Sequence, residues 1–514
     1  MKRKGLALIL ALTVTIVMCF TGCGDKGVSI DSDLSMAEDV EKYVNAIDIE
    51  YAYDLSEKLA YDEEYWDCEL GWRTAGSDAE HRCADFLAEE MEKIGLTDIE
   101  KIPTKVDKFQ FNDSSLTVDG TEIDLTPAAY QCSGTDKDGI TAEIVNVGTG
   151  FEADYDGLDV KDKIVIAQVD QANESWIDGY IRQAHEKGAA ALVSYANSGY
   201  GELNEDTANV QDICCADLIP TVAISYNQAQ DVLKAIEAGN NKATLMVDAE
   251  FEPDKGTSYN VVGYIKGKSS DQQIMLSGHY DKYWYGFQDD CAAIGMDFTI
   301  AKAMIDSGYV PENDIAVVAH GAEEWGVSGS EYDWSAGAYE EIVNVHPDWV
   351  DGAFAIVNND GGYTVEGETC AGTGSSAELV GFIKESIGGL NEESPYDWSY
   401  YGNSTGTEDF YWTLMGIPSI VAENGDGTVY FDKGYHSTYD STEAQPLNEE
   451  GFNDIIRTYG KLVIDLDAKA VRPLCFTDRI SSFEESLAEG ADFEAVIAEA
   501  KDAAAALEAK MAEV

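Results

Sequence analysis

From about residue 258 the chain alternates short apolar runs with longer segments of helical periodicity. The apolar runs predict strands at 260–265, 273–276, 315–319, 353–357 and 417–422, and the periodic segments predict helices at 290–307, 376–388 and 445–466. Strands that alternate with helices in this way form mainly parallel sheets with helices on both faces. We therefore expect an α/β fold with a mainly parallel, mixed central sheet flanked by helices.

An earlier segment carries the boundary signals of a helix. Ser77 and Glu80 have the spacing of a capping box, apolar residues recur through residue 94, and Gly95 follows. These features predict a helix over residues 77–94. We assign residues 46–128 and 251–470 to one domain.

Residues 129–250 form a second, smaller unit inserted in that domain. Its apolar runs predict strands at 140–147, 163–169, 190–195 and 219–224, and its helical segments lie at 178–187 and 228–238. No acids, His or Cys occur there in a catalytic spacing. We expect this insert to have a structural or substrate-restricting role.

The two ends of the chain differ in sequence pattern from the two domains. Three basic residues and an apolar run from Leu6 to Phe20 precede Thr21-Gly22-Cys23, which predicts a signal over residues 1–22. The segment resembles a bacterial lipoprotein signal with Cys23 as the lipidated residue; an ordinary signal or a single anchoring helix is the alternative. Residues 23–45 are predicted to be a tether.

After Pro473 an apolar helical stripe predicts a helical extension over residues 471–514, packed as a hairpin or used as an intermolecular helix.

Composition narrows the possible partners. Asp plus Glu number 97 against 33 Lys plus Arg, for a formal charge of −64, and 45% of residues are hydrophobic. Such a chain can bury a large core, but its charge repels phosphate backbones and anionic lipid headgroups. We expect no nucleic-acid partner and no membrane contact except through a lipid at Cys23. The predicted location is therefore the outer face of the bacterial cell membrane, where disulfides are permitted, although buried thiols are an equal alternative for the cysteines.

The chemistry-bearing residues follow the ends of the predicted strands. Ligands of open α/β sheets bind outside the carboxyl ends of the strands. At these ends the sequence places the following residues: Gly278-His279-Tyr280-Asp281, Gln288-Asp289-Asp290, Glu323-Glu324-Trp325, Asn358-Asn359-Asp360 and Tyr435-His436. Imidazole and carboxylate together suit zinc, and such a set suits two divalent ions that share a carboxylate.

The adjacent acids Glu323 and Glu324 can divide two tasks. Successive residues of an extended segment point in opposite directions, so one can bind metal while the other takes a proton from water. Asp281, two residues after His279, can hold the imidazole in one tautomer.

This series resembles the family of di-zinc aminopeptidases and glutamate carboxypeptidases, over residues 46–128 and 251–470. The insert, with Ile219-Pro220-Thr221-Val222-Ala223-Ile224, resembles the protease-associated domain that this family often carries. The resemblance implies that one zinc is bound by His279, Asp289 and Glu324 and the other by Asp289, Asp360 and His436. It also implies that Glu323 is the general base and that Asp281 supports His279. Gln288, Cys291-Ala292-Ala293 and Thr407-Glu408-Asp409 depart from the family pattern, so the pocket shape stays open.

The expected activity is hydrolysis of peptide bonds by a zinc metallopeptidase. An aminopeptidase needs anions for the free α-amine of its peptide substrate, and Glu408 and Asp409 are candidates; Tyr280 and Trp325 could wall a side-chain pocket. A carboxypeptidase needs cations, and the motifs have only Lys282 and Lys433 nearby. Release of N-terminal residues is therefore the favoured activity. A glutamate-type carboxypeptidase, glutaminyl cyclase-like acyl transfer and a non-catalytic peptide-binding lipoprotein remain the alternatives. The oligomeric state is not predicted.

Overall fold

The computed structural model describes most of the chain after residue 37. The described ranges are residues 38–119, 121–122, 128–170, 176–196, 205–210, 215–269, 272–328, 334–361, 365, 370–388, 397–403, 407–423, 433–487 and 493–513. The predicted signal, Cys23 and the first part of the predicted tether lie outside the described residues.

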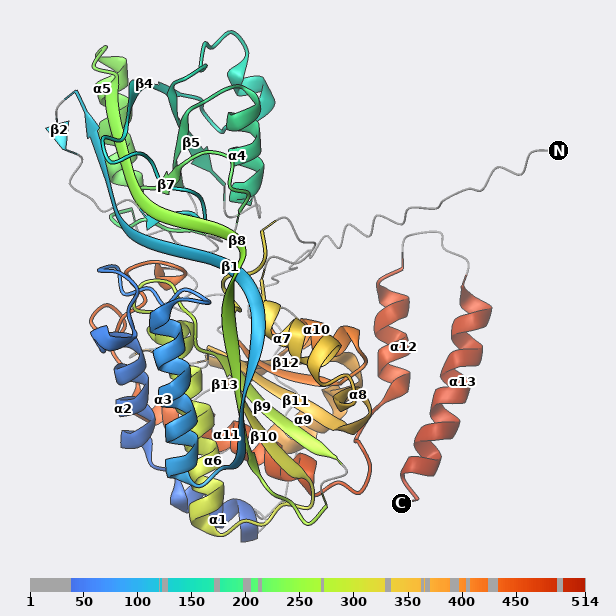
Figure 1. Cartoon of the computed structure of the whole chain (residues 1–514). Coiled ribbons are helices and arrows are strands. Elements are labelled where there is room, and N and C mark those ends of the chain that lie inside the picture. The colour runs from blue at the N-terminus through green and yellow to red at the C-terminus, as the bar shows by residue number, and fades with distance from the viewer. Residues whose placement is uncertain are drawn as a thin grey trace.

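The helices and strands alternate through most of the chain (Figure 1). The helices are α1 Glu38–Ala46, α2 Ile49–Tyr61, α3 Asp78–Ile94, α4 Ile177–Glu186, α5 Tyr226–Glu237, α6 Ala292–Ser307, α7 Ala336–Glu340, α8 Trp349–Gly352, α9 Val380–Gly388, α10 Asp409–Leu414, α11 Glu449–Asp467, α12 Phe476–Glu485 and α13 Glu494–Met511. The strands are β1 Thr97–Val118, β2 Thr121–Glu122, β3 Ala128–Ala129, β4 Ile140–Asn146, β5 Ile164–Val169, β6 Ala191–Ala196, β7 Thr221–Ala223, β8 Lys242–Ile265, β9 Gln273–His279, β10 Asp314–His320, β11 Ala353–Asp360, β12 Cys370–Ser375, β13 Asp397–Asn403 and β14 Ser419–Glu423.

The sheet is mixed, with a parallel centre. Its strands follow the order β13-β12-β14-β11-β9-β10-β8-β4-β5-β6-β7-β3. β14, β11, β9 and β10 are parallel neighbours, whereas β8 is antiparallel to β10 and β4. The expected fold class, a mainly parallel mixed sheet flanked by helices with a smaller inserted domain and a helical C-terminal region, is the one observed.

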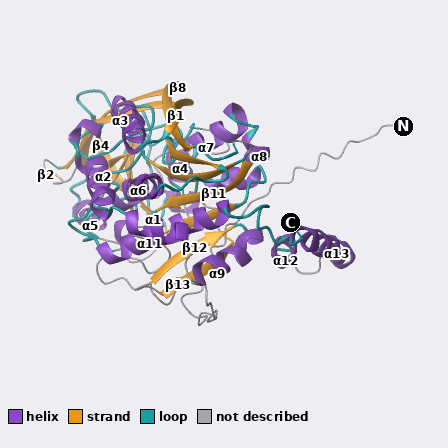
Figure 2. Ribbon diagram, turned by 90° about the horizontal axis from the view of Figure 1, so that it is seen from below, coloured by secondary structure: helices purple, strands orange, loops and turns teal. Residues whose placement is uncertain are grey.

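Helices cover both faces of the parallel part of the sheet (Figure 2). Along β10, Ile315 and Val317 pack into a core with α1, α2, α3, α6 and α11, whereas Ala316 and Val318 pack into a second core with α7, α8 and α10. Successive side chains of a strand point to opposite faces, so an uninterrupted apolar run can fill both cores.

The two long strands β1 and β8 join the insert to the larger domain. They pair antiparallel from Thr97 with Tyr264 to Val118 with Ala243, and in Figure 1 the pair runs from one domain into the other. The prediction for residues 260–265 captured only the end of β8. The pairing has register shifts after Thr97, Val106 and Phe111, where the ladder is irregular.

The predicted tether is too long at its C-terminal end. Residues 38–46 form α1, in which Val40 and Tyr43 are buried, and the Tyr43 hydroxyl donates to the carbonyl oxygen of Ile456 at 2.7 Å. This segment packs on the domain because its apolar residues lie on one side of the helix.

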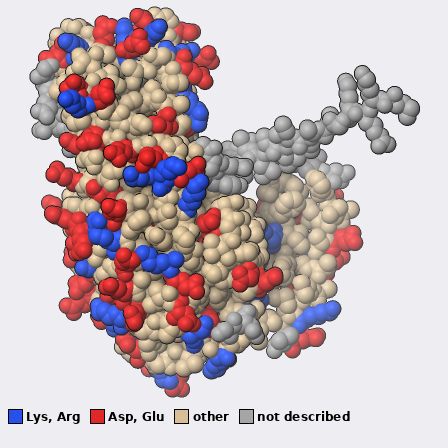
Figure 3. Space-filling view, in the orientation of Figure 1, with Lys and Arg blue, Asp and Glu red and all other residues tan. Residues whose placement is uncertain are grey.

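The C-terminal extension is a helical hairpin of α12 and α13, which stands beside the body in Figure 1. Acidic side chains are scattered over both domains on the face shown in Figure 3. Among the described residues, no helix has the length and apolar character that a bilayer span needs.

Candidate active site

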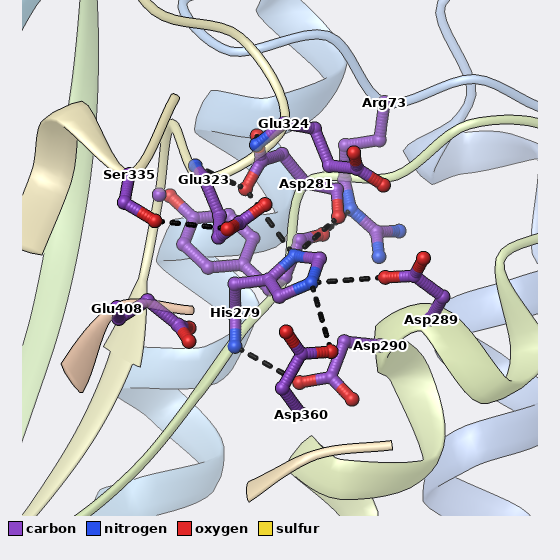
Figure 4. Close-up of polar contacts among 12 residues, drawn as sticks. Arg73, His279, Asp281, Asp289, Asp290, Glu323, Glu324, Ser335, Asp360 and Glu408 are labelled. Carbon is purple, nitrogen blue, oxygen red and sulfur yellow. Dashed lines mark hydrogen bonds and ion pairs between the residues drawn. The ribbon is translucent and has the colours of Figure 1, made fainter. Parts of the chain in front are cut away.

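The strand ends of β9, β10 and β11 meet at one edge of the sheet. The parallel register places His279 of β9 opposite His320 of β10, and Ser277 of β9 opposite Asn358 of β11. The segments that follow these strands therefore begin at nearly the same level. Figure 4 shows His279, Glu323, Glu324 and Asp360 gathered there around one centre.

His279 presents one ring nitrogen to a cluster of acids. Its Nδ1 lies 3.0 Å from the carbonyl oxygen of Asp281, an acceptor, so Nδ1 carries a proton. Its Nε2 lies 3.0 Å from Asp289 Oδ1 and 3.9 Å from Asp360 Oδ1. A lone pair that faces two carboxylate oxygens requires a cation or a second proton between them.

The second imidazole approaches Asp289 from the other side. His436 Nε2 lies 3.2 Å from Asp289 Oδ2 and 3.3 Å from Glu324 Oε2. The two oxygens of Asp289 therefore face two different histidines. The ring of Tyr283 lies edge-on against His436 with 4.6 Å between ring centroids, and its hydroxyl donates to the carbonyl oxygen of Glu324 at 2.6 Å.

This donor set fits divalent metal ions. His279, Asp289 and Glu324 offer ligand atoms within 4.8 Å of one another, and so do His279, Asp290 and Asp360. Glu324 Oε1 is buried and has no hydrogen-bond partner among the described residues. An ionised carboxylate without a partner is costly to bury, so the site is electrostatically complete only with a cation present.

The pKa values of the buried acids also indicate that the site needs a cation. Burial raises the pKa of Glu323 to about 8. Burial and the neighbouring charge of Asp289 raise the pKa of Glu324 and of Asp360 well above their usual range. Burial acts in the same direction on Asp289, but its hydrogen bonds with His279 and His436 outweigh it and lower that pKa. Close carboxylates resist simultaneous ionisation, and bound cations remove that resistance.

Two further acids hold the ligands in place. Asp290 accepts hydrogen bonds from the backbone N–H of His279 at 3.0 Å and of Gly361 at 2.9 Å, which joins the ends of β9 and β11. Asp440 accepts from the backbone N–H of Gln288 at 2.8 Å and of Asp289 at 3.1 Å. Asp440 thereby joins the loop of His436 to the segment that carries Asp289.

The residues predicted to bind substrate divide into two groups. Glu408 is buried near the acids, with Oε2 2.8 Å from Asn358 Nδ2, and burial raises its pKa. Figure 4 shows it on the side of His279 opposite Asp289. Asp409 begins α10 and accepts a hydrogen bond from the backbone N–H of Thr407 at 3.3 Å.

The aromatic predictions require correction. Tyr280 is fully buried in the core, and its hydroxyl contacts Glu80 and lies 2.7 Å from the carbonyl oxygen of Tyr259. Trp325 is buried beside Tyr283, with 4.4 Å between ring centroids. Both side chains are packed in the interior, so neither is placed to line a substrate pocket.

Two cations close to the motifs, Lys282 and Arg73, are buried and bound to the backbone. Lys282 donates to the carbonyl oxygens of Gly71 and of Trp284, the latter at 2.7 Å. Arg73 donates to the carbonyl oxygens of Tyr280 and of Leu59, the latter at 2.8 Å. These contacts fix the segment after His279.

The insert touches the loop of a predicted ligand. The backbone N–H of Val210 donates to the carbonyl oxygen of His436 at 3.3 Å, and the hydroxyls of Thr207 and Thr438 lie 2.8 Å apart. The insert is thus in contact with the site's edge.

Four residues around the centre have positive φ angles without being glycine. They are Trp284, Ala322, Ser335 and His436, with φ of 45°, 57°, 49° and 40°. Such conformations persist only where surrounding contacts enforce them, and they concentrate at functional sites.

Neither candidate metal group among the described residues contains a cysteine. Among the described residues, Cys68, Cys83, Cys132, Cys291 and Cys475 are free thiols. Cys291 accepts a weak hydrogen bond from Arg73 at 3.5 Å. The side chains of Cys214 and Cys370 lie outside the described residues.

The sequence analysis assigned no role to several residues that the structure brings to the site: Asp290, Ser335, Asn358 and Asp440. Asp290 and Asn358 stand next to predicted strand-end residues, so their position was a usable signal. Asp440 and Ser335 lie in segments with no distinctive pattern in a chain of 97 acids.

Comparison with known proteins agrees with this geometry. Residues 260–462 match the model of peptidase family M28, and residues 140–232 match the PA domain. A probable leucine aminopeptidase 2 of Aspergillus fumigatus is 29% identical over 265 residues, which are 51% of this chain and 50% of that protein. A probable leucine aminopeptidase 2 of Aspergillus oryzae is 27% identical over 413 residues, covering 74% of this chain and 77% of that protein. The match thus spans about half the length of the first of these relatives.

A solved structure shares the fold. The peptidase M28 precursor of Shewanella amazonensis superposes with a TM-score of 0.66 at 20% sequence identity, over 84% of this chain and 97% of that one. The ligand-bearing strand ends described above all fall within the matched residues 260–462. The region of residues 260–462, which carries the candidate site, is therefore of peptidase family M28, and a PA domain is inserted ahead of it.

Proposed function

We propose that the chain is a zinc aminopeptidase that removes N-terminal residues from peptides at a pair of zinc ions. The observation that carries the proposal is the position of Asp289 between two imidazoles, one facing each of its carboxylate oxygens. A carboxylate shared in this way is the ligand that a two-metal site requires.

The contacts favour a specific division of the ligands. His279 and Asp360 lie on the Oδ1 side of Asp289, whereas His436 and Glu324 lie on its Oδ2 side. This division exchanges Glu324 and Asp360 relative to the assignment implied by resemblance alone. The reason is the distances: His436 Nε2 lies 3.3 Å from Glu324 Oε2, whereas His279 Nε2 lies 3.9 Å from Asp360 Oδ1.

Bound zinc would supply Lewis acidity, which lowers the pKa of water and polarises the scissile carbonyl. Glu323 would accept the water proton and pass it to the leaving amine. The backbone carbonyl oxygen of Asp281 would hold the Nδ1 proton of His279, since it lies 3.0 Å from that nitrogen. The Asp281 carboxylate, which was predicted for this role, lies 3.6 Å from Nδ1 and accepts the backbone N–H groups of Glu323 and Glu324 instead.

The charges around the centre favour an aminopeptidase over a carboxypeptidase. Glu408 Oε1 is buried without a hydrogen-bond partner among the described residues, so it can receive a substrate ammonium group. Lys282 and Arg73, which could otherwise bind a C-terminal carboxylate, are bound to backbone carbonyls. We therefore assign recognition of the free α-amine to the acids around Glu408.

A substrate panel tests the function. Purified protein is assayed with aminoacyl-arylamides, their N-acetylated forms and N-blocked dipeptides with a free C-terminus, before and after treatment with a chelator. We expect cleavage of the free-amine substrates only, loss of activity with the chelator and recovery with zinc. Equal cleavage of blocked and free substrates would reject the aminopeptidase, and persistence of activity without metal would reject the metal mechanism.

We also propose that the protein is exported and anchored by lipid at Cys23. The support is the sequence alone: three basic residues, the apolar run to Phe20 and the small residues before Cys23. In cell fractionation the protein should be membrane-bound, and Cys23→Ser should release it. Membrane association that survives Cys23→Ser would favour the anchoring-helix alternative.

A further inference from the structure

Ser335 contacts the predicted general base at two points. Its Oγ donates to Glu323 Oε1 at 2.8 Å, and its backbone N–H donates to the carbonyl oxygen of Glu323 at 2.7 Å (Figure 4). Asp281 binds Glu323 only through the backbone N–H, at 3.1 Å. Of these two residues, Ser335 is therefore the one that contacts the carboxylate of Glu323.

The backbone of Ser335 is held in an unusual conformation. Its φ of 49° and ψ of 34° lie in the left-handed region, immediately before α7. The residue is fully buried. A non-glycine residue in this region costs free energy, so its neighbours must enforce the conformation.

The enforcing contacts join α7 directly to the segment that carries the base. Asn260 accepts a hydrogen bond from the backbone N–H of Gly321 at 3.1 Å and donates to the carbonyl oxygen of Gly337 at 2.9 Å. A Cβ atom on Gly337 would lie 1.9 Å from the carbonyl oxygen of Gly321, so only glycine allows this approach. The start of α7 and the Glu323 segment are therefore one rigid unit.

We propose that Ser335 is a positioning residue that orients the Glu323 carboxylate for proton transfer. This inference rests on the proposed function, in which Glu323 is the base. With Oε1 engaged by the Ser335 hydroxyl, Oε2 is the oxygen left to receive the proton of the attacking water. A carboxylate on a flexible side chain gains from such orientation, because misplacement by about 1 Å can reduce a rate by about 100-fold.

Three substitutions separate the hydroxyl from the backbone. Ser335→Ala removes the donor and keeps the strained conformation, whereas Ser335→Gly removes the donor and relieves the strain. Ser335→Asn supplies a side-chain N–H donor on a residue that tolerates the left-handed region. We expect Ala and Gly to lower kcat by about 10- to 100-fold with KM and zinc content unchanged, and Asn to recover part of the loss.

A double-mutant cycle with Glu323→Gln identifies the residue through which Ser335 acts. If Ser335 acts through the base, Ser335→Ala should change the residual activity of Glu323→Gln by less than about twofold to threefold. Ser56→Ala is the matched control, since the buried Ser56 hydroxyl bonds only within α2, to the carbonyl oxygen of Ala52 at 2.8 Å. Thermal unfolding of each variant verifies that it is folded.

The outcomes distinguish this inference from the proposed function. Wild-type activity of both Ser335→Ala and Ser335→Gly, with Glu323→Gln inactive, would overturn the role of Ser335 and leave the base intact. An equal loss from Ser335→Ala in the wild-type and Glu323→Gln backgrounds would also overturn it. Full activity of Glu323→Gln would reject the base itself, and with it the role of Ser335.

Discussion

Asp281 accepts a hydrogen bond from the backbone N–H of Glu323 at 3.1 Å, so one carboxylate joins the segment of His279 to the segment of the base. Its other oxygen accepts from the backbone N–H of Glu324 at 3.0 Å. A single acid therefore sets the relative position of three residues of the proposed mechanism.

Asp281→Asn should weaken the site without unfolding the domain. The amide has one acceptor oxygen, so its NH₂ group would face the N–H of Glu323 or Glu324. We expect zinc affinity or turnover to fall by about 10- to 100-fold, as for other residues that support metal ligands. Chelator competition and kcat measure the two effects, and Asp306→Asn, on an exposed acid of α6, should match the wild type.

Glu323→Gln should abolish turnover and keep the metal. The amide preserves the size of the side chain but cannot accept a proton, so kcat should fall by about 10³-fold or more. Zinc content by elemental analysis should equal that of the wild type, and Glu186→Gln, on an exposed acid of α4, should have no effect. A variant within tenfold of wild-type activity would show that Glu323 is not the base.

Asp440→Asn should lower zinc affinity through Asp289. Both carboxylate oxygens of Asp440 accept backbone N–H groups, at 2.8 and 3.1 Å, and an amide can accept only one of them. We expect chelator to remove zinc from the variant at about 10-fold lower concentration. Glu443→Gln changes an exposed acid of the same loop and is the control. Unchanged zinc affinity of Asp440→Asn would show that the loop of His436 is held by other contacts.

Glu80 should make stability depend on pH. It is buried in α3 and accepts hydrogen bonds from the Ser258 hydroxyl at 3.0 Å and the Tyr259 backbone N–H at 3.3 Å, and burial raises its pKa to about 8. A raised carboxyl pKa means that the folded state holds the proton longer than the unfolded state. The free energy of unfolding therefore falls as pH rises from the unfolded pKa of about 4.3 towards 8.

Glu80→Gln tests this dependence because it removes the titrating group and keeps an acceptor oxygen. The difference in Tm between variant and wild type, both loaded with zinc, should shift in favour of the variant between about pH 5 and pH 8. Parallel Tm curves over that range would contradict the assignment. Exposed Glu312→Gln, scanned under the same conditions, controls for general charge effects.

Much of the candidate site follows from residue types and order. His279, Asp289, Glu324, Asp360 and His436 were placed at strand ends because parallel strands end at one edge of a sheet. The structure does bring these side chains around one centre, with contacts of 3.0 to 3.9 Å. The alternating apolar runs also predicted the sheet class, since helix and strand periods differ.

Tertiary structure alone decided how these groups are paired and held. The partition of ligands about Asp289, the support by Asp440 and the contact of Ser335 with Glu323 join residues that are 10 to about 150 positions apart. Such contacts depend on strand register and loop conformation, which no local pattern encodes. Tyr280 shows the same limit, because an aromatic residue beside a ligand can face either the pocket or the core, and strand geometry turned it to Glu80. The sequence thus determined which chemistry the chain carries, and packing determined which atoms perform it.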